Sequence, residues 1–376
     1  MQQLPYGRQS IDDSDIEAVM AVLRGDWLTT GPAVTRFEQD LAAWTGAPTV
    51  AVTSGTAALH VAYAAAGIGP GDEVVTSPLT FVATAATASQ LGAAVVFADV
   101  TAYTANLDPA AAAADVTDQT RVVSAVDYAG HPADLGDLRS VAHDASALLL
   151  EDASHSIGSR WRDRPVGSVA DLTTFSFYPT KNLTTTEGGA LSALDPRLLD
   201  RAARFRNHGL VREKDRQRSP DEGGWHQEVH ELGLNYRLPD VLCALGSSQL
   251  RRLATFKERR AQIVARYRAG LENVDGLILP TRRADVDPIW HLFAVKVLAG
   301  RRRALYDHLR DRGIGVQVNF VPVYWHPAYA DMGYRRGQCP VAEEFYRRQL
   351  SLPLFADLRE DQVDRVIGEV RQFFGA

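Results

Sequence analysis

Short β-rich runs alternate with alanine-rich stretches that favour helix between about residues 48 and 195. This alternation limits the fold more than any other feature, because strands separated by helices form a parallel sheet that the helices cover. Helices are expected over 57–66 and 81–91, and the Gly/Pro-rich stretch 67–73 predicts the loop that ends the first of them. About seven strands are expected, enough for one large sheet, over 49–53, 73–76, 94–100, 121–127, 147–151, 173–177 and 189–194.

The remaining sequence predicts a helical connection followed by a smaller domain. Apolar residues recur at spacings of three and four over 240–253 and 260–271, as on one face of a helix. We therefore expect a large domain over 1–255 and a small α+β domain over 256–376. In the small domain, the patterns predict helices over 303–312 and 341–350 and strands near 289–297 and 315–321. The polar segment 212–224 contains Gly and Pro, which is typical of a mobile loop or lid.

Composition excludes several classes of protein. With 40 basic and 46 acidic residues, the formal net charge is -6, so the chain has no excess of positive charge for a nucleic-acid partner. No basic region followed by an apolar run opens the sequence, and no apolar stretch reaches the length of a membrane span, so neither export nor a membrane partner is expected. Cys243 and Cys339 give neither metal-ligand spacing nor a disulfide framework. We therefore expect no metal site and a cytoplasmic location.

Lysine is rare in this chain: 36 arginines accompany only Lys181, Lys214, Lys257 and Lys296. Lys181 lies in the stretch TTFSFYPTKNLTTTEGGAL, after an expected strand and before a glycine pair that leads into the next strand. It is therefore expected on a loop at the edge of the sheet. A partly desolvated amine there loses its proton more easily and can form a Schiff base with a carbonyl compound. The alternative is an ordinary surface lysine.

A carboxylate follows directly on a buried strand in ALLLEDASHSIGS, residues 147–159. Open α/β sheets bind ligands at the carboxyl ends of their strands, so Asp152 is expected to reach a ligand there. The alternative is that Asp152 caps a helix.

A strand, a turn of small residues and an alanine-rich helix follow one another in TVAVTSGTAALHVA, residues 49–62. Ser54, Gly55 and Thr56 therefore precede a helix N-terminus, whose free N–H groups and dipole favour a phosphate. The Gly-Lys-Ser/Thr signature of a nucleotide P-loop is absent. Helix capping alone is the alternative.

An anion cradle, a strand-end carboxylate and a loop lysine are together what pyridoxal 5'-phosphate (PLP) requires. At these motifs the sequence resembles the DegT-type sugar aminotransferases, which are PLP enzymes of the aspartate-aminotransferase fold (fold type I). The resemblance covers nearly the whole chain. It implies an α/β architecture, with the cofactor on a large domain with a mainly parallel sheet, and a transaminase that alternates between PLP and its amine form, PMP.

The resemblance also implies roles for single residues. In the block SFYPTK, Lys181 matches the Schiff-base lysine and Ser176 a phosphate-binding serine. Asp152 matches the partner of the pyridine nitrogen, and His155, where many relatives have Gln, is expected near the phenolic oxygen of the cofactor. Phe81 matches an aromatic residue that stacks on the cofactor ring, although a core position is the alternative.

The segment LGLNYRLPD, residues 232–240, resembles one whose asparagine reaches the cofactor phosphate of the neighbouring subunit. Asn235 thus implies a homodimer with shared active sites.

Both ends of the chain resemble the subgroup that aminates C4 of nucleotide-linked 4-keto-6-deoxyhexoses, especially the pseudaminic-acid pathway type. The segments concerned are PYGRQSIDDSDIEAV, GDWLTTGP, WHLFAV, GIGVQVNFVPVYWHP and LSLPLF. The resemblance implies a dTDP- or UDP-linked sugar substrate and L-glutamate as amino donor, with 2-oxoglutarate as the second product. The product would serve a glycosylated natural product or a surface glycan. Candidate substrate contacts are Trp27, Thr29, Arg237, Tyr324 and His326, with core packing as the alternative for the aromatic residues.

Two other functions remain open at this point. Related PLP enzymes dehydrate deoxysugars, and in some of them histidine replaces the lysine, so Lys181 argues against that version. A PLP-fold protein can also bind or regulate without catalysis. The complete set of Asp152, Ser176, Lys181 and Asn235 argues against that second alternative.

Overall fold

The computed structural model describes residues 3–376, and its centre is a seven-stranded sheet with the order β1-β9-β8-β5-β4-β2-β3. The strands are β1 (Thr49–Val52), β2 (Glu73–Thr76), β3 (Ala94–Phe97), β4 (Thr120–Val126), β5 (Leu148–Asp152), β8 (Leu172–Ser176) and β9 (Gly189–Ala193). Strands β3, β2, β4, β5 and β8 pair in parallel, whereas β9 is antiparallel to both of its neighbours. Each strand expected in this region is present, so the predicted mainly parallel α/β sheet is confirmed.

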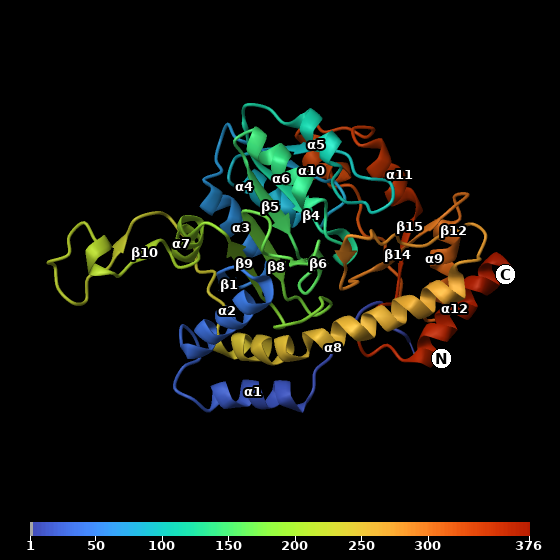
Figure 1. Cartoon of the computed structure of the whole chain (residues 1–376), viewed down its shortest axis with the longest axis horizontal. Helices are drawn as coiled ribbons and strands as arrows, with labels where there is room; N and C mark the ends of the chain where they lie inside the picture. Colours follow the sequence, from blue (N-terminus) through green and yellow to red (C-terminus); the bar gives the residue numbers. More distant parts are fainter. Residues whose placement is uncertain (1–2) are drawn as a thin grey trace.

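Alternate residues of the central strands face two different cores, which is why these runs are almost wholly apolar. On β4, Val122 packs in the core that contains α3 (Gly55–Ala66), whereas Val123 packs in the core that contains α6 (Leu135–Asp144). The first face also carries α4 (Ala83–Gln90) and α7 (Pro196–Phe205), and the second carries α5 (Pro109–Asp115) and α2 (Pro32–Thr45). Helices thus cover both faces of the sheet (Figure 1).

Helix α8 (Asp240–Leu271) is a single helix of 32 residues that runs past the sheet to the C-terminal elements (Figure 1). The sequence pattern predicted helix over 240–253 and 260–271 only. Residues 254–259 contain neither Gly nor Pro, so the helix continues through them. The predicted domain boundary near residue 255 falls inside this helix, and the division into two domains stays a prediction. Helix α1 (Asp13–Leu23) packs along α8.

The chain beyond α8 forms a second, antiparallel sheet. Its strands are β12 (Leu277–Ile278), β14 (Phe293–Val297) and β15 (Gln349–Leu352). The helices are α9 (Arg302–Asp311), α10 (Pro327–Asp331), α11 (Pro340–Arg348) and α12 (Glu360–Phe374). The helix expected over 341–350 ends at Arg348, because the next residues pair with β14.

The strand expected over 315–321 does not form, and that prediction is wrong. A single bridge joins Gln317 to Ser351 in this segment. The backbone N–H of Asn319 donates to the side-chain oxygen of Gln349 at 2.8 Å, and the Tyr128 hydroxyl donates to the Asn319 carbonyl. Because side chains occupy these backbone groups, the segment cannot continue a ladder of backbone hydrogen bonds.

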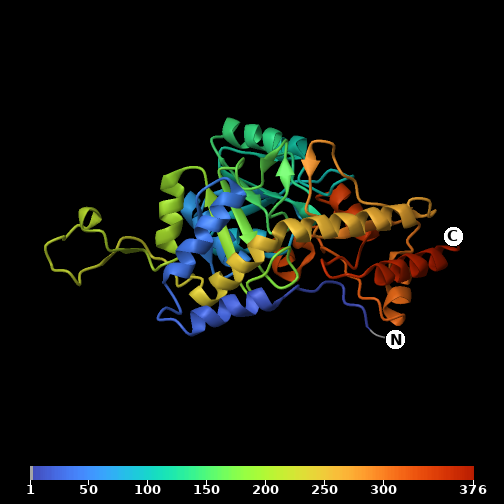
Figure 2. The ribbon, with the colours of Figure 1, turned by 60° about the horizontal axis from the view of Figure 1, so that its bottom comes forward.

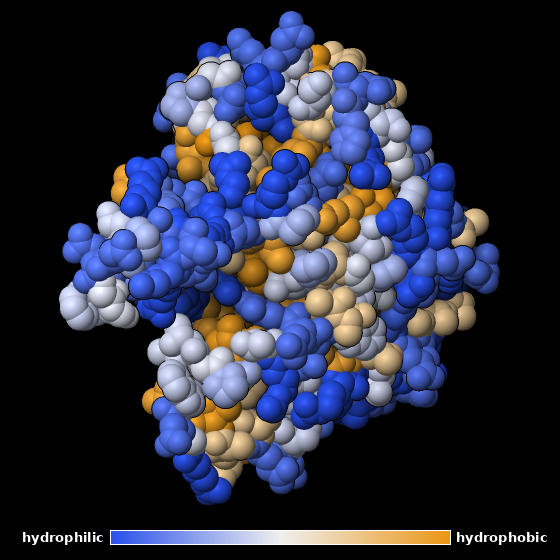
Figure 3. All heavy atoms as spheres, turned by 60° about the vertical axis from the view of Figure 1, so that its left-hand side comes forward, coloured by the Kyte–Doolittle hydropathy of each residue, from blue (hydrophilic) through white to orange (hydrophobic). Residues whose placement is uncertain are grey.

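Residues 210–229 form an arm that projects from the body of the molecule (Figures 1 and 2). The short strands β10 (Leu210–Val211) and β11 (Glu228–Val229) pair in it, and they enclose the segment that was expected to be a mobile loop or lid. Figure 3 shows hydrophobic patches between hydrophilic ones on the side from which the arm projects. Leu232, just beyond the arm, is 91% exposed.

A third small sheet completes the fold, with β6 (Arg160–Trp161), β7 (Arg164–Pro165) and β13 (Val286–Asp287). Among residues 3–376, no helix combines the length and the apolar character that a membrane crossing needs.

Helix α8 packs so closely on α2 that Gly246 has no room for a side chain. An added Cβ would lie 2.5 Å from the buried ring of Phe37. We therefore expect Gly246→Ala to lower the free energy of unfolding by about 1–3 kcal/mol, as overpacking does. Gly368 of α12 is the matched control, because its added Cβ meets nothing within 4 Å. Gly368→Ala should instead raise the free energy of unfolding by about 0.5–1 kcal/mol, as expected in a helix. Urea unfolding measures both, and equal shifts of the same sign would contradict this account.

Candidate active site

A cavity of about 490 Å³ opens at the carboxyl ends of the parallel strands β4, β5 and β8. Of the residues expected to bind the cofactor, the structure brings all but Asn235 to its wall. They are Ser54, Gly55, Thr56, Phe81, Asp152, His155, Ser176 and Lys181. These residues come from segments far apart in the sequence, and the parallel sheet brings their strand ends to one edge.

The turn before α3, which was expected to bind an anion, lies in the wall of this cavity. The Ser54 side chain caps α3 by accepting from the N–H of Ala57 at 3.0 Å. The N–H groups of Gly55 and Thr56 have no partner within the helix, because they lie in its first turn. An added Cβ on Gly55 would lie 2.7 Å from the Cβ of Ser176. One on Gly189 would lie 2.4 Å from the Ser54 carbonyl oxygen. Two glycines therefore allow the turn to lie against the ends of β8 and β9, with the Ser176 hydroxyl beside the helix N-terminus.

Asp152 ends β5, and its carboxylate is held on both oxygens. The Thr84 hydroxyl donates to Oδ2 at 2.6 Å, and the Ser154 hydroxyl donates to Oδ1 at 2.6 Å. Thr84 is in turn paired with Thr80 at 2.7 Å. The carboxylate is thus fixed in direction before any ligand binds, which lowers the cost of organising the site.

The neighbouring Glu151 faces the other side of the sheet, as strand alternation requires. It accepts from the Thr173 hydroxyl at 3.0 Å and from the N–H of Gly167 at 3.2 Å. Burial raises the pKa of Glu151 to about 7. Only Asp152 of the two carboxylates therefore serves the cavity.

Lys181 lies on the loop after β8. Its N–H donates to the Tyr178 carbonyl at 2.9 Å, and the loop closes where Thr185 N–H and the Thr184 hydroxyl both donate to the Phe177 carbonyl at 3.0 Å. Burial lowers the pKa of Lys181 to about 8, and the negative charge of Asp152 opposes part of that shift. Near neutral pH a useful fraction of the amine is therefore uncharged and nucleophilic.

Two imidazole rings, His155 and His291, lie together in the cavity wall with their centroids 4.2 Å apart. Burial holds the pKa of both well below the ordinary value, and the charge of Lys181 adds to the effect. Both rings are therefore neutral at pH 7. The turn after β4 lies against both residues. The N–H of His291 donates to the Ala129 carbonyl at 2.8 Å. An added Cβ on Gly130 would lie 2.9 Å from the His155 carbonyl oxygen, so the turn approaches His155 closely.

Aromatic side chains form the more open part of the wall. Phe81 is 59% exposed and contacts Phe320 edge to face, with ring centroids 6.3 Å apart. Tyr178 also lines the cavity and is exposed. Phe81 is thus at the cavity mouth and not in the core.

Four predicted residues lie outside the cavity wall on an exposed or partly exposed surface. Asn235 is exposed and bridges to Asn207, and Arg237 donates to the Asn207 side chain at 2.7 Å. Trp27 and Thr29 are exposed in the loop between α1 and α2. That loop adjoins the start of α8, since Leu28 accepts from the N–H of Asp240 at 3.0 Å.

The remaining two predicted substrate contacts are also not among the lining residues. Tyr324 is only 1% exposed: its hydroxyl donates to Glu343 at 2.8 Å and accepts from the N–H of Cys339 at 3.2 Å. In this structure it therefore has the core role that was the alternative. His326 is exposed at the start of α10.

Several lining residues received no role from the sequence. Most of them lie near the predicted motifs, among them Thr84 and Tyr178, but four come from distant segments: Tyr6, His291, Asn319 and Phe320. The motifs PYGRQ, WHLFAV and VQVNF contain them, but nothing in the local pattern places these segments beside the sheet. Only the tertiary contacts reveal their position.

Comparison with known proteins gives consistent matches over the whole chain. The profile of the DegT/DnrJ/EryC1/StrS aminotransferase family matches residues 9–371. The spore coat polysaccharide biosynthesis protein SpsC of Bacillus subtilis is 41% identical over 375 residues, covering 98% of this chain and 96% of that protein.

Two solved structures are similar over nearly their full length. The putative sugar aminotransferase Spr1654 of Streptococcus pneumoniae, in its PMP form, has a TM-score of 0.93 at 28% identity and covers 99% of both chains. Helicobacter pylori PseC, an aminotransferase involved in the biosynthesis of pseudoaminic acid, has a TM-score of 0.93 at 27% identity and covers 100% of both chains. Spr1654 is also known in a PLP form.

The donor groups of the cavity fit PLP. The cradle at Gly55 and Ser176 suits a phosphate, and a side chain at position 55 would fill it. The oriented carboxylate of Asp152 and the amine of Lys181, with its lowered pKa, line the same space. Taken with the matches to this family over the whole chain, these features show that the protein belongs to the DegT/DnrJ/EryC1/StrS family and is a PLP-dependent sugar aminotransferase.

Proposed function

We propose that the enzyme transfers the amino group of L-glutamate to C4 of a nucleotide-linked 4-keto-6-deoxyhexose. The products are the 4-amino-4,6-dideoxy sugar and 2-oxoglutarate. The proposal rests on one observation above all: Lys181, Asp152 and the Ser54–Thr56 turn line the same cavity. The C4 position rests on the segments that resemble the C4 subgroup and on the similarity to PseC. The similarity to SpsC supports a role in making a glycan or another glycosylated product.

PLP, when bound, supplies an aldehyde that takes up amino groups and a ring that withdraws electrons from the reacting carbon. Lys181 Nζ provides the amine by which the protein holds the cofactor. Because its pKa is about 8, the same nitrogen can accept a proton and return it near neutral pH. The hydrogen bonds that close the loop on Phe177 hold the backbone of Lys181 near the end of the sheet.

The other residues orient and stabilise the bound group. The anionic carboxylate of Asp152, fixed by Thr84 and Ser154, would keep the pyridine nitrogen protonated. The α3 turn and Ser176 would hold the phosphate at the opposite end. His155 stays neutral, so it can donate one hydrogen bond to an oxygen without adding a charge. Phe81 would cover the open face of the ring.

We also propose a homodimer with shared active sites. Asn235 is exposed and outside the cavity of its own chain, as expected if it serves a partner. Large apolar side chains are exposed on the segment of Asn235, at Leu232 and Leu234, and on the loop after α1, at Trp27 and Leu28. The contact of Leu28 with Asp240 brings these two segments side by side. A patch of this kind on a monomer marks an interaction surface.

The nucleotide is left open between dTDP and UDP, and a visible absorbance titration decides it. The purified enzyme, supplied with PLP, should lose its visible band with L-glutamate. The band should return with only one of two substrates, dTDP-4-keto-6-deoxyglucose or the UDP-linked 4-keto-6-deoxy-N-acetylhexosamine. Lys181→Ala is the control and should lose turnover by several orders of magnitude while keeping its fold. Steady-state amination by that variant would contradict the role of Lys181, and loss of the band without return by any keto sugar would contradict the sugar substrate.

Capture of PLP by the empty protein should depend on pH, because only the uncharged amine attacks an aldehyde. The rate should rise with pH and level off above about 8, the pKa of Lys181. In Asp152→Asn the charge that opposes the lowered pKa is gone, so the profile should move to lower pH. Turnover should also fall on the order of 10²-fold, as for loss of an oriented electrostatic group. Stopped-flow absorbance measures both proteins, and free PLP contributes equally to each. A shift to higher pH would contradict this assignment.

Shared active sites can be tested by mixing two defective variants. Asn235→Ala should weaken cofactor retention by about 1.5–3 kcal/mol, the range for a hydrogen bond to a charged group. Co-expressed with Lys181→Ala at limiting PLP, it should form mixed dimers in which one site is intact and the other carries both changes. Random pairing predicts about a quarter of the wild-type activity. Activity no greater than the mean of the two variants would show that the sites are not shared.

A further inference from the structure

The first residues of the chain form an extended segment, residues 3–12, that we call the N-terminal strap. It starts beside the C-terminal elements: Leu4 N–H donates to the Gly313 carbonyl and Gly315 N–H donates to the Leu4 carbonyl, both at 2.8 Å. Farther along, Leu354 N–H donates to the Tyr6 carbonyl at 3.2 Å. The strap then runs beside α8 to α1, as Figures 1 and 2 show. It therefore connects two regions that are distant in sequence.

The strap lies directly on the loop that carries Lys181. An added Cβ on Gly7 would lie 3.5 Å from the Thr180 side chain, which is van der Waals contact. Residues 8–10 share a narrow space with Lys181 and Asn182. The strap also contributes Tyr6 to the cavity wall, where its hydroxyl donates to the Asn319 side chain at 3.1 Å. The cavity is incomplete without this segment.

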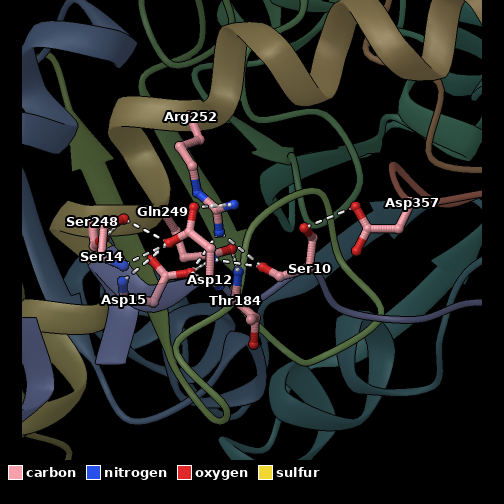
Figure 4. A network of polar contacts seen from close by, with 9 residues as sticks. All are labelled: Ser10, Asp12, Ser14, Asp15, Thr184, Ser248, Gln249, Arg252 and Asp357. Carbon is pink, nitrogen blue, oxygen red and sulfur yellow. Dashed lines mark hydrogen bonds and ion pairs between the residues drawn. The ribbon is translucent and has the colours of Figure 1, made fainter. Parts of the chain in front are cut away.

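One buried side chain of α8, Gln249, joins the strap to the lysine loop (Figure 4). It is 1% exposed. Its amide nitrogen donates to the Ser10 carbonyl at 2.9 Å and to Asp15 Oδ2 at 2.7 Å. Its amide oxygen accepts from the N–H of Thr184 at 3.4 Å. Thr184 is one of the two residues that close the lysine loop on the Phe177 carbonyl. The side-chain amide of Gln249 therefore forms hydrogen bonds to both the strap and the lysine loop.

An ion pair holds the strap end of this network in place. Arg252 lies 2.7 Å from Asp12 and also pairs with Asp15, whose side chain is fully buried (Figure 4). Its guanidinium donates to the Ser10 carbonyl at 3.0 Å as well. Removing a partner from a buried charge is strongly unfavourable, so the strap is firmly anchored at this point. Gln249 connects this anchored end of the strap to the lysine loop, because its amide oxygen accepts from the N–H of Thr184.

We propose that Gln249 is a positioning residue of the active site, which fastens the N-terminal strap to the Lys181 loop so that Lys181 and Tyr6 keep their places in the cavity. The inference rests on the proposed function of Lys181. It goes beyond that function because neither Gln249 nor the strap carries out chemistry.

The test uses two variants, and each is designed to loosen a different end of the strap. Gln249→Met keeps the volume of the side chain but removes its three hydrogen bonds. Gly315→Ala acts at the other end, because its added Cβ would lie 2.6 Å from the Tyr6 nitrogen. The matched controls are Gln262→Met, at an exposed position of the same helix, and Gly368→Ala, whose added Cβ meets nothing. If one variant fails to fold, the other still tests the same segment.

Two measurements are made on each full-length variant. Hydrogen exchange followed by mass spectrometry, without cofactor, reports the order of peptides covering 3–12 and 177–187. The rate of PLP capture and its pH profile report the position and environment of Lys181. In both variants we expect faster exchange in the two peptides but not in the central strands, slower PLP capture on the order of tenfold, and a shifted pH profile. Neither control should show these changes.

The outcomes separate this inference from the proposed function. Faster exchange in the strap with unchanged PLP capture would overturn the inference, because the strap would then be structural only. Unchanged exchange in the 177–187 peptide would overturn it too, since Gln249 would not connect the two segments. Failure of the wild-type protein to capture PLP at all would instead refute the role of Lys181.

Discussion

The close approach of the α3 turn to the ends of β8 and β9 is the contact on which the active site depends. Side chains at positions 55 and 189 would separate these elements by colliding with Ser176 and with the Ser54 carbonyl. Because both positions are glycine, a helix N-terminus, a serine hydroxyl and the lysine loop share one edge of the sheet. Asp152 reaches the same edge on β5. This half of the cavity, where we propose that the cofactor binds, is therefore a direct product of sheet geometry, and its main polar groups sit on rigid elements.

Electrostatics then distinguishes groups that look alike in the sequence. Glu151 and Asp152 are neighbours, yet alternation sends one to each side of the sheet, and only Asp152 is held by hydroxyl donors on both oxygens. Burial lowers the pKa of Lys181. When Lys181 is protonated, its positive charge lowers the pKa of His155 and His291 and so helps to keep both rings neutral. The cavity wall thus contains an oriented carboxylate, Asp152, and an amine, Lys181, whose pKa is lowered. That combination suits proton transfer near neutral pH.

The sequence predicts the parts of the structure that depend on local pattern. Strands of the main sheet follow from runs of apolar residues, and the cofactor residues follow from short motifs at strand ends. Prediction failed where a distant side chain decides the backbone: residues 315–321 are not a strand, because Gln349 and Tyr128 bind the backbone of Asn319. His291 and Tyr6 were not assigned because only tertiary contacts bring them to the cavity, and for Tyr324 the core position given as the alternative is the one observed, against Glu343. These contacts join segments that are far apart in the sequence, and no local pattern in either segment predicts that they meet.

The hydrogen bond from Leu354 to Tyr6 has a consequence for synthesis on the ribosome. Because Tyr6 precedes Leu354 by several hundred residues, it leaves the exit tunnel long before Leu354 does. The sheet and its cofactor cradle can assemble while translation continues, but Tyr6 has no place to dock until the C-terminal strands have emerged. A nascent chain that has already formed the cradle therefore still has an open wall. The finished cavity exists only once the chain has been made as far as Leu354.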